Sequence, residues 1–310
     1  MTPQKTKTAK KVTILDRLSY LALVIIECIF RIFPCSFVWK MGAYTGQLIM
    51  LAAKQRRIIA TYNLRLVHPE ASDEDIKQYT KDIFRHSFGN LFSSIKTSTI
   101  PADQIQDHFE TEDFHRLNEL SADQGAILLL FHMGNWEMLT KMTALLPEHK
   151  ALGGMYRPLK NPLIDAHVRN KREADGSLLF SRKRGLIKAS QHIRNGGILG
   201  ILCDQAAGHA GMRMPLFGKE TSITPLPAIL ALKYNCPVFP ISLESTTPGK
   251  WKMKVHSPLV FSADANKESA TQEITTVMEK LMKAYSKNIF WLHNRWKMKP
   301  NDIKGSQGEE

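Results

Sequence analysis

The chain contains few cysteines, and none of them is spaced as a metal ligand or as part of a disulfide framework. Its 310 residues include four cysteines, with no CxxC pair and no cluster of Cys and His. Zinc sites and disulfide-rich scaffolds depend on such spacings, so neither is indicated, and a reducing, cytoplasmic setting fits best. The cysteines are Cys28, Cys35, Cys203 and Cys236.

Other signatures are also absent. No G-x-S-x-G sequence occurs, which argues against a serine nucleophile and a covalent acyl-enzyme. The chain has no internal repeat, low-complexity tract or long Gly/Ser linker, so it is not a repeat array or a string of loosely joined domains. Its hydrophobic content of 43% is enough to bury a large core. The sequence therefore predicts a globular protein without a clear boundary inside its main body.

Acidic residues are scarce relative to basic ones. There are 42 Lys and Arg against 29 Asp and Glu, which gives a formal charge of +13. Such an excess favours an acidic partner: nucleic acid, an anionic membrane surface, or an acidic protein or substrate. The basic residues are scattered rather than interleaved with aromatic residues, and no nucleic-acid recognition motif occurs, so nucleic acid is disfavoured. A non-enzymatic basic protein that binds through charge alone stays open as an alternative.

A long apolar segment follows a basic leader near the N-terminus. Residues 18–39 read LSYLALVIIECIFRIFPCSFVW, a run long enough to cross a bilayer. Glu27 and Arg31 lie in its middle and Pro34 bends any helix there, so a helix anchored on or half embedded in the membrane is preferred to a full span. The alternative is an ordinary buried helix. The basic residues of the leader are Lys5, Lys7, Lys10, Lys11 and Arg17.

Beyond this segment the chain is typical of helices up to about residue 120, and then of strands that alternate with helices. The alternation predicts an α/β fold: a mainly parallel sheet with helices on both faces, preceded by the N-terminal hydrophobic membrane-associated helix. We divide the chain into a leader and membrane anchor, residues 1–40, and a main domain, residues 41–310. The segments that carry this prediction are strands at 126–131, 196–204 and 236–244, and helices at 225–235 and 271–288.

The strand AILLLF ends at a histidine, in the sequence FHMGNWEM (131–138). Ligands of parallel sheets gather at the carboxyl ends of the strands, and His132 lies at such an end. Gly134 permits a tight turn, and Asn135 is placed to cap a helix that carries Glu137 in its first turn. Glu137 could then accept a hydrogen bond from one imidazole nitrogen and leave the other as a general base. The alternative is a strand-end histidine and a glutamate that only favours the helix dipole.

Several segments favour the functional interpretation. FHMGNWEM resembles the H-x4-[D/E] signature of the lysophospholipid acyltransferases, specifically of the late lipid A acyltransferases that add secondary lauroyl or myristoyl chains. The superfamily more often has Asp where this chain has Glu137, and glutamate fits the late lipid A branch. Similar segments follow in the family's order, within about residues 15–296: YNLRLVHPE (62–70), MYRPLKNPLIDAHVRNKR (155–172), GGILGILCDQAAG (196–208) and MPLFGKETSITPLPAILALKYNCPVFPI (214–241).

The resemblance implies roles for particular residues. His132 would be the general base and Glu137 its orienter. Arg157 and Arg169 would hold phosphate or the thioester oxyanion, a task suited to a planar, permanently charged group, although a solvated basic face is the alternative. For some of the remaining candidates, a structural role in a turn or a helix cap is nearly as good an explanation as substrate binding. These candidates are Asp204 and Gln205 at a strand end, and Phe217, Gly218 and Thr224 in a loop that would close over the substrate.

The resemblance also implies a reaction: acyl transfer in lipid A biosynthesis at the cytoplasmic face of the bacterial inner membrane. His132 would deprotonate a hydroxyl on an acyl chain of a lipid A precursor, and that oxygen would attack the thioester of acyl-acyl carrier protein. No metal, nucleotide or prosthetic group of the enzyme's own is implied, because the thioester is already activated. The acidic carrier protein and the anionic lipid would both account for the charge of +13. The alternatives are an acyl thioester hydrolase with the same two residues, and an acyltransferase for a different glycolipid or phospholipid.

Overall fold

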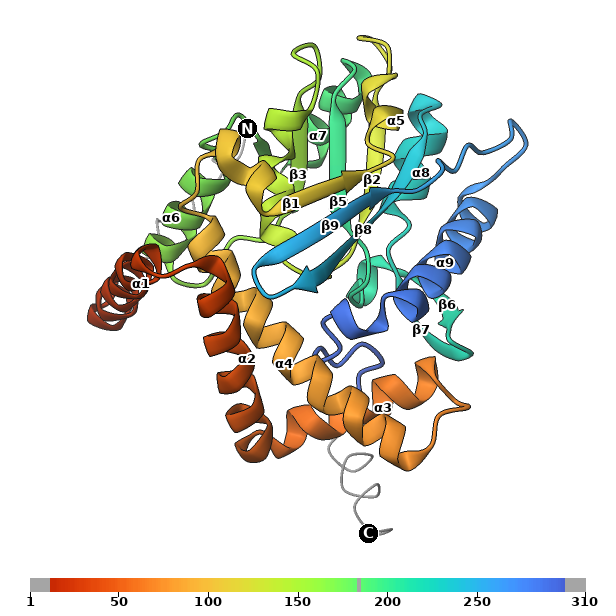
Figure 1. The fold of residues 1–310 in the computed structure, drawn as a ribbon. Helices are drawn as coiled ribbons and strands as arrows, with labels where there is room; N and C mark the ends of the chain where they lie inside the picture. The colour runs from red at the N-terminus through yellow and green to blue at the C-terminus, as the bar shows by residue number, and fades with distance from the viewer. Residues whose placement is uncertain (1–11, 183–184, 299–310) are drawn as a thin grey trace, which may run out of the picture.

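A seven-stranded sheet lies at the centre of the computed structural model, which describes residues 12–182 and 185–298 (Figure 1). The strand order is β1-β9-β8-β2-β5-β3-β4. The strands from β8 to β4 in that order run parallel, whereas β9 runs antiparallel to β8 and β1 runs parallel to β9. The prediction of a mainly parallel sheet is confirmed. The strands are β1 (Phe109–Glu112), β2 (Ala126–Leu130), β3 (Leu152–Tyr156), β4 (Leu178–Ser181), β5 (Ile198–Leu202), β8 (Val238–Thr247) and β9 (Lys250–Val255).

Helices and one separate hairpin complete the fold. The strands predicted at 126–131, 196–204 and 236–244 form β2, β5 and β8, and the predicted helices form α8 and α9. The first part of the chain is helical as expected, although β1 interrupts it. The helices are α1 (Ile14–Ile32), α2 (Cys35–Ala52), α3 (Lys54–Val67), α4 (Asp73–Thr97), α5 (His115–Asn118), α6 (Pro162–Glu173), α7 (Leu186–Arg194), α8 (Leu226–Tyr234) and α9 (Lys267–Ala284), with 3-10 helices η1 (Ala102–Asp107), η2 (Trp136–Leu145), η3 (Gly208–Ala210) and η4 (Ser286–Asn288) and the hairpin β6 (Met212–Leu216) and β7 (Lys219–Ile223).

Helices cover both faces of the sheet, as the alternation predicts. Ile127 and Leu129 of β2 belong to a core that also contains residues of α7, α8 and α9. Leu128 and Leu130 of the same strand belong to a second core, which contains residues of η2 and α5. Successive side chains of a strand point to opposite faces, so these two cores lie on opposite sides of the sheet. Burial on both faces explains why β2 reads as an unbroken apolar run.

The N-terminal helices pack closely onto the rest of the chain. The break between α1 and α2 falls at Phe33 and Pro34, where proline was expected to bend the helix. A Cβ built on Gly42 of α2 would lie 2.3 Å from the carbonyl oxygen of Phe88 in α4, so these two helices approach as closely as backbones allow. Residue 40, which ends the predicted anchor, falls inside α2, and Trp39 before it is buried. The helix break at Pro34 therefore separates α1 from the remaining helices.

Helix α1 exposes an apolar stripe. On its inner side Glu27 and Phe30 are buried. None of the helices within residues 12–182 and 185–298 combines the length and apolar character needed to cross a bilayer. The basic leader from Lys5 to Lys11 lies outside the described residues. The apolar side chains that α1 exposes are Ile14, Leu15, Leu18, Leu21, Ile25, Ile26, Ile29 and Ile32.

Candidate active site

His132 and Asp204 meet at the carboxyl edge of the sheet. β2 and β5 are parallel neighbours, and the register pairs Leu130 with Leu202, the last residues of the two strands. His132 and Asp204 each stand two residues beyond that pair. The backbone N–H of His132 donates to Oδ1 of Asp204 at 3.0 Å, and its Nδ1 lies 2.8 Å from the same oxygen. Two loops that are remote in sequence thus each contribute one side chain to a hydrogen-bonded pair.

The pair carries perturbed protonation equilibria. Burial opposes the charged imidazole, but the charge and hydrogen bond of Asp204, with a contribution from Glu137, raise the pKa of His132. Burial would raise the pKa of Asp204, but the nearby His132 charge and its hydrogen bonds lower it. The Asp204 side chain is 4% exposed and that of His132 is 21% exposed. Asp204 holds Nδ1, so Nε2 is the nitrogen that a substrate can reach.

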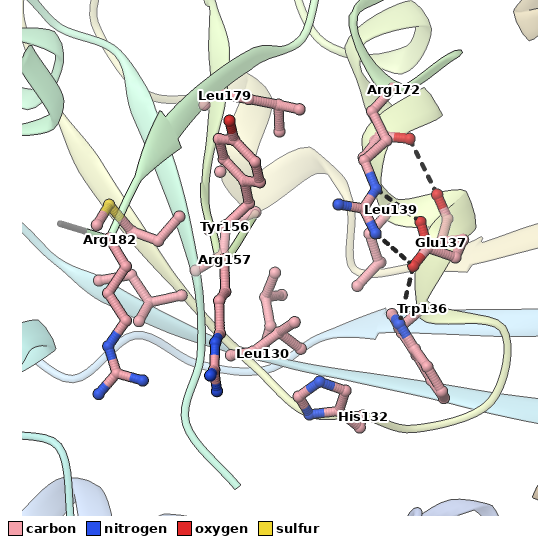
Figure 2. A pocket seen from close by; sticks show the side chains of 18 of the residues that line it. Leu130, His132, Trp136, Glu137, Leu139, Tyr156, Arg157, Arg172, Leu179 and Arg182 are labelled. Atoms are coloured by element: carbon pink, nitrogen blue, oxygen red, sulfur yellow. Dashed lines mark hydrogen bonds and ion pairs between the residues drawn. The ribbon is translucent and has the colours of Figure 1, made fainter. Parts of the chain in front are cut away.

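Glu137 does not make the contact predicted for it. Its carboxylate accepts two hydrogen bonds from Arg172 of α6, from Nε at 2.8 Å and from Nη2 at 2.7 Å, and one from Nε1 of Trp136 at 3.2 Å (Figure 2). The hydrogen-bonding partner of the His132 imidazole is Asp204 instead. Glu137 stands on the first turn of η2 and points towards α6, whereas Asp204 is brought beside the histidine by strand register. Glu137 still acts on His132 through its charge.

The turn between β2 and η2 is fixed by the conformation of Gly134 and by contacts with distant segments. Gly134 adopts φ +55, so the tight turn expected at this glycine is confirmed. Asn135 makes no capping hydrogen bond to η2, contrary to expectation, and its side-chain amide donates to Oγ1 of Thr97 at the end of α4 at 3.0 Å. The backbone N–H of Phe290 donates to the carbonyl of His132 at 2.9 Å. Contacts from α4 and from the C-terminal segment thus fix the loop that carries His132.

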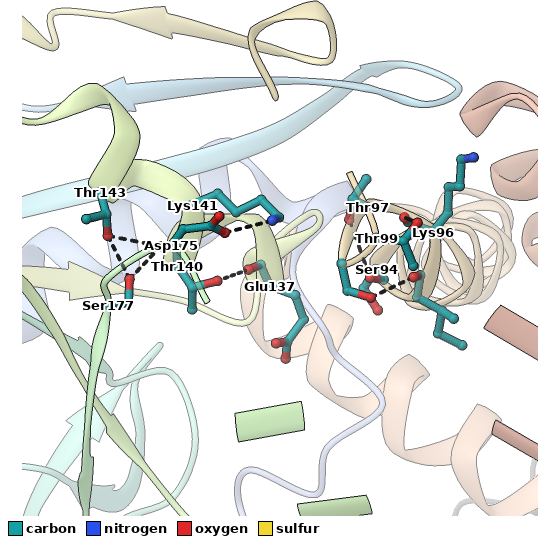
Figure 3. A network of polar contacts seen from close by, with 12 residues as sticks. Ser94, Lys96, Thr97, Thr99, Glu137, Thr140, Lys141, Thr143, Asp175 and Ser177 are labelled. Carbon is teal, nitrogen blue, oxygen red and sulfur yellow. Dashed lines mark hydrogen bonds and ion pairs between the residues drawn. The ribbon is translucent and has the colours of Figure 1, made fainter. Parts of the chain in front are cut away.

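A polar network anchors η2 to the segment between α6 and β4 (Figure 3). The ammonium of Lys141 lies 2.8 Å from Oδ2 of Asp175. Ser177 donates to the carbonyl of Thr140 at 2.5 Å, and its hydroxyl lies 2.7 Å from that of Thr143. These contacts tie the helix that carries Glu137 to the chain that follows Arg172. The Glu137–Arg172 pair is therefore held from both sides.

A cavity of about 500 Å³ opens beside the His132–Asp204 pair. Its walls come mainly from apolar residues of β2, β3, β4, β5 and η2. Gly154 of β3 faces open space, because a Cβ built on it would find its nearest neighbour, Cδ2 of Leu179, at 3.8 Å. Figure 2 shows the guanidinium of Arg157 on the side of the cavity where His132 lies. An imidazole with one nitrogen on a carboxylate and the other at an apolar cavity can take a proton from a bound hydroxyl.

The remaining candidates divide between the cavity and other places. Arg157, Gln205 and Thr224 line the cavity. Arg169 does not; it pairs with Glu173 at 3.4 Å and lies over the ring of Tyr156. Its place at the cavity is taken by Arg172, one turn further along α6. Arg169 therefore does not lie at the cavity, contrary to the expectation from the family resemblance.

Phe217 and Gly218 are a second correction. They form the turn of the β6–β7 hairpin with φ values of +51 and +70, as expected for a two-residue turn with both residues left-handed. Neither lines the cavity beside His132. The backbone N–H of Phe217 donates to Glu279, which holds the turn against α9. The expected substrate-closing role of this pair has no support in the geometry.

The cavity also has polar and aromatic lining residues that the sequence does not single out, among them Trp136, Arg172, Arg182 and His293. His293 belongs to the C-terminal segment FWLHNRW, which follows the last helix and crosses the site. In the same segment Arg295 is 2% exposed and donates to Oγ1 of Thr221 at 2.8 Å, and burial lowers its pKa to about 10. A dense run of aromatic and basic residues beyond the last helix was the signal available. It indicates a segment that packs, but not which site it reaches.

Comparison with known proteins points to one family. A family model described as bacterial lipid A biosynthesis acyltransferase matches residues 5–298. The lipid A biosynthesis lauroyltransferase of Escherichia coli (strain K12) is 24% identical over 276 residues, covering 87% of this chain and 88% of that protein. A lipid A biosynthesis acyltransferase of Haemophilus influenzae is 22% identical over 257 residues, covering 82% of this chain and 78% of that protein. The 1-acyl-sn-glycerophosphate acyltransferase PlsC from Thermotoga maritima is similar with a TM-score of 0.38 and 15% identity, covering 76% of this chain and 97% of that chain.

Proposed function

The chain belongs to the family of bacterial lipid A biosynthesis acyltransferases, and from this membership we propose that it transfers a fatty acyl chain from acyl-acyl carrier protein to a hydroxyl of a lipid A precursor. It is an acyltransferase, and its reaction belongs to lipid A biosynthesis. The observation that carries the proposal is the His132–Asp204 pair beside an apolar cavity that His132 lines. The pair supplies a base, and the cavity suits a hydrocarbon chain.

His132 acts as the general base of this reaction. Nε2 takes the proton from the acceptor hydroxyl while the oxygen attacks the thioester carbonyl, and the C–S bond then breaks. The proton that His132 has gained passes to the departing thiolate, so no other reactant is needed. Asp204 holds Nδ1 and stabilises the imidazolium formed during attack, and Glu137 adds negative charge nearby.

Arg157 can meet negative charge on the side of the cavity where His132 lies. It lines the cavity, and it is exposed. A guanidinium there can hold a substrate phosphate or the oxyanion that develops on the thioester carbonyl. Gln205 and Thr224 line the same cavity and can supply further hydrogen bonds.

The acyl chain of the donor lies in the 500 Å³ cavity, with its thioester at the His132 end. Gly154→Val should shift the preferred donor to shorter acyl chains, because the new side chain enters the open space beside β3. One methylene in an apolar pocket is worth about 1–3 kcal/mol, so the ratio of kcat/KM between long and short donors should fall by roughly 10-fold or more. Transfer rates with a series of acyl-carrier proteins of increasing chain length measure this ratio, and Gly154→Ala serves as the graded control. An unchanged preference in a folded Gly154→Val protein would place the chain elsewhere.

The exposed stripe of α1 holds the enzyme at the cytoplasmic face of the inner membrane, helped by the excess of basic residues. Replacing Leu18, Ile25 and Ile29 together by Gln should release most of the protein from vesicles that contain anionic lipid, because the buried apolar area is lost. Co-sedimentation with vesicles measures binding. A matched control replaces three exposed apolar residues away from α1, Leu186, Ile187 and Val260.

These substitutions test the anchor better than deletion of residues 1–40, because that deletion also removes buried side chains such as Val38 and Trp39. Full binding of the α1 variant at high salt would show that α1 is not the principal anchor. Equal release of the control variant would attribute the effect to general loss of surface apolarity.

Acyl transfer and thioester hydrolysis are separated by one assay. Purified protein is incubated with acyl-acyl carrier protein with and without a lipid A precursor, and both acylated lipid and free fatty acid are measured. The proposal expects thioester consumption that depends on the lipid and yields acylated lipid. Acyl release that ignores the lipid would favour the hydrolase. Mass spectrometry of lipid A from cells with and without the gene tests the same proposal in the cell, where one acyl chain should be lost.

A further inference from the structure

A second cavity, of about 250 Å³, lies between α1, α4, α6 and η2. Its described lining includes two residues of α1, Leu23 and Glu27, and α1 is the helix that exposes the apolar stripe. Residues from four helices and from two loops thus surround a space to which the mechanism at His132 assigns no substrate group. Its apolar lining residues are Leu23, Ile95, Met138, Leu159 and Val168.

The two cavities adjoin at the Glu137–Arg172 pair. Glu137, Thr140, Leu159 and Arg172 line both of them. The pair therefore stands at the junction between the larger cavity, which begins at His132, and the smaller one, which reaches α1. A ligand that fills both spaces has to pass this junction.

The charged groups on the wall of the second cavity are neutralised in pairs. Glu27 of α1, which is buried, lies 3.0 Å from Nε2 of His167 and 3.2 Å from the ammonium of Lys171, both on α6. Glu137 is paired with Arg172 and Lys141 with Asp175. An anionic group would have to compete with these partners, whereas a hydrocarbon chain can lie against the apolar residues without disturbing any pair.

We propose that this second cavity holds the hydrocarbon tail of the acceptor, that is, the part of the hydroxyacyl chain beyond the hydroxyl that is acylated. The inference rests on the proposed function. The reaction joins two acyl chains at one oxygen, and each chain runs away from the reacting atoms. The two cavities adjoin at the Glu137–Arg172 pair, and His132 lines the larger of them. They therefore match two chains: the donor chain in the larger cavity and the acceptor tail in the smaller one. The smaller cavity is lined in part by α1, the helix that we propose lies on the membrane. An acceptor that comes from the membrane therefore has a shorter path to the smaller cavity than to the larger one.

Acceptors with different tails test this assignment. The probes are two phosphorylated glucosamines, one N-acylated with a 3-hydroxybutanoyl group and the other with a 3-hydroxytetradecanoyl group, each with the same acyl-acyl carrier protein. The wild-type protein should show a lower KM for the long-tailed acceptor. Val168→Phe should narrow the KM difference between the two acceptors by roughly 10-fold or more, because a ring occupies space that the tail needs.

Two further variants keep the test decisive. Ile95→Phe enters the same cavity from α4 and should have the same effect if Val168→Phe does not fold. Ile187→Phe adds the same kind of bulk at an exposed site on α7, lines neither cavity, and should leave both KM values as in the wild type. Equal KM changes for both acceptors, or none, in the folded cavity variants would overturn the assignment. If the wild-type protein acylates neither acceptor nor a lipid A precursor and only hydrolyses the thioester, the proposed function fails and this inference falls with it.

Discussion

Asp204→Asn is expected to reduce single-turnover acyl transfer by roughly 10²-fold or more, and His132→Ala at least as strongly, as expected when general-base catalysis is lost. Asparagine retains the shape of Asp204 but cannot stabilise the imidazolium, and it can hold the imidazole in the wrong tautomer. His132→Ala removes the base itself. Rapid-quench measurement of transfer from acyl-acyl carrier protein gives the chemical step, and thermal unfolding of each variant shows whether the fold is retained.

The pH profile separates a catalytic Asp204 from a structural one. A general base must be neutral, so wild-type kcat/KM should rise with pH through the raised pKa of His132. In Asp204→Asn the carboxylate that favours the charged imidazole is gone while burial, which disfavours it, remains. The rising limb should therefore move to lower pH. If folded Asp204→Asn shows the rising limb at the wild-type pH and a near-wild-type rate, Asp204 has no catalytic role. Near-wild-type transfer by folded His132→Ala would rule out His132 as the base.

Glu137→Ala should also slow the chemical step, by roughly 10²-fold, although Glu137 does not touch the imidazole. Its charge favours the imidazolium, and its two hydrogen bonds hold Arg172 at the junction of the cavities. Glu137→Gln keeps the shape of the side chain and removes the charge, so it should lose most of the same rate. A glutamate with only a packing role would leave Glu137→Gln near wild-type turnover.

Arg172→Met distinguishes two ways in which Glu137 could act. It leaves the carboxylate in place and removes its partner. If the pair acts as a unit, Arg172→Met should slow transfer as much as Glu137→Gln does, and the double variant should be little slower than the slower single variant. If Glu137 turns to the imidazole by itself during the reaction, Arg172→Met should retain the wild-type rate. The His132→Ala, Glu137→Ala double variant provides the same additivity test for the histidine.

Short-range patterns account for the correct sequence predictions. The apolar runs that became β2, β5 and β8 are buried strands whatever their neighbours are, and Pro34 ends α1 because proline lacks the N–H of a helix interior. Gly134 was identified as a turn because few other residues reach a φ of +55. The ordered segments from 62–70 to 214–241 also identified the family, which the match over residues 5–298 confirms.

The partners of side chains were predicted less well, because they depend on how distant segments pack. The sequence places Arg169 and Arg172 on the same basic stretch, and only the packing of α6 against η2 turns Arg172 to Glu137 and Arg169 to Tyr156. The family resemblance predicts a substrate loop at Phe217 and Gly218, whereas the chain forms a hairpin turn there. That this turn does not line the cavity depends on how distant segments of the chain pack.

The sequence by itself determined the α/β class, the position of a histidine at a strand end and the family of the chain. Only the tertiary structure decided which carboxylate serves that histidine. Glu137 is only five residues away along the chain, but the parallel register that pairs Leu130 with Leu202 brings Oδ1 of Asp204, 72 residues away, to 2.8 Å from Nδ1 of the ring. The register of two strands is set by long-range hydrogen bonds and packing, and spacing along the chain carries no record of it.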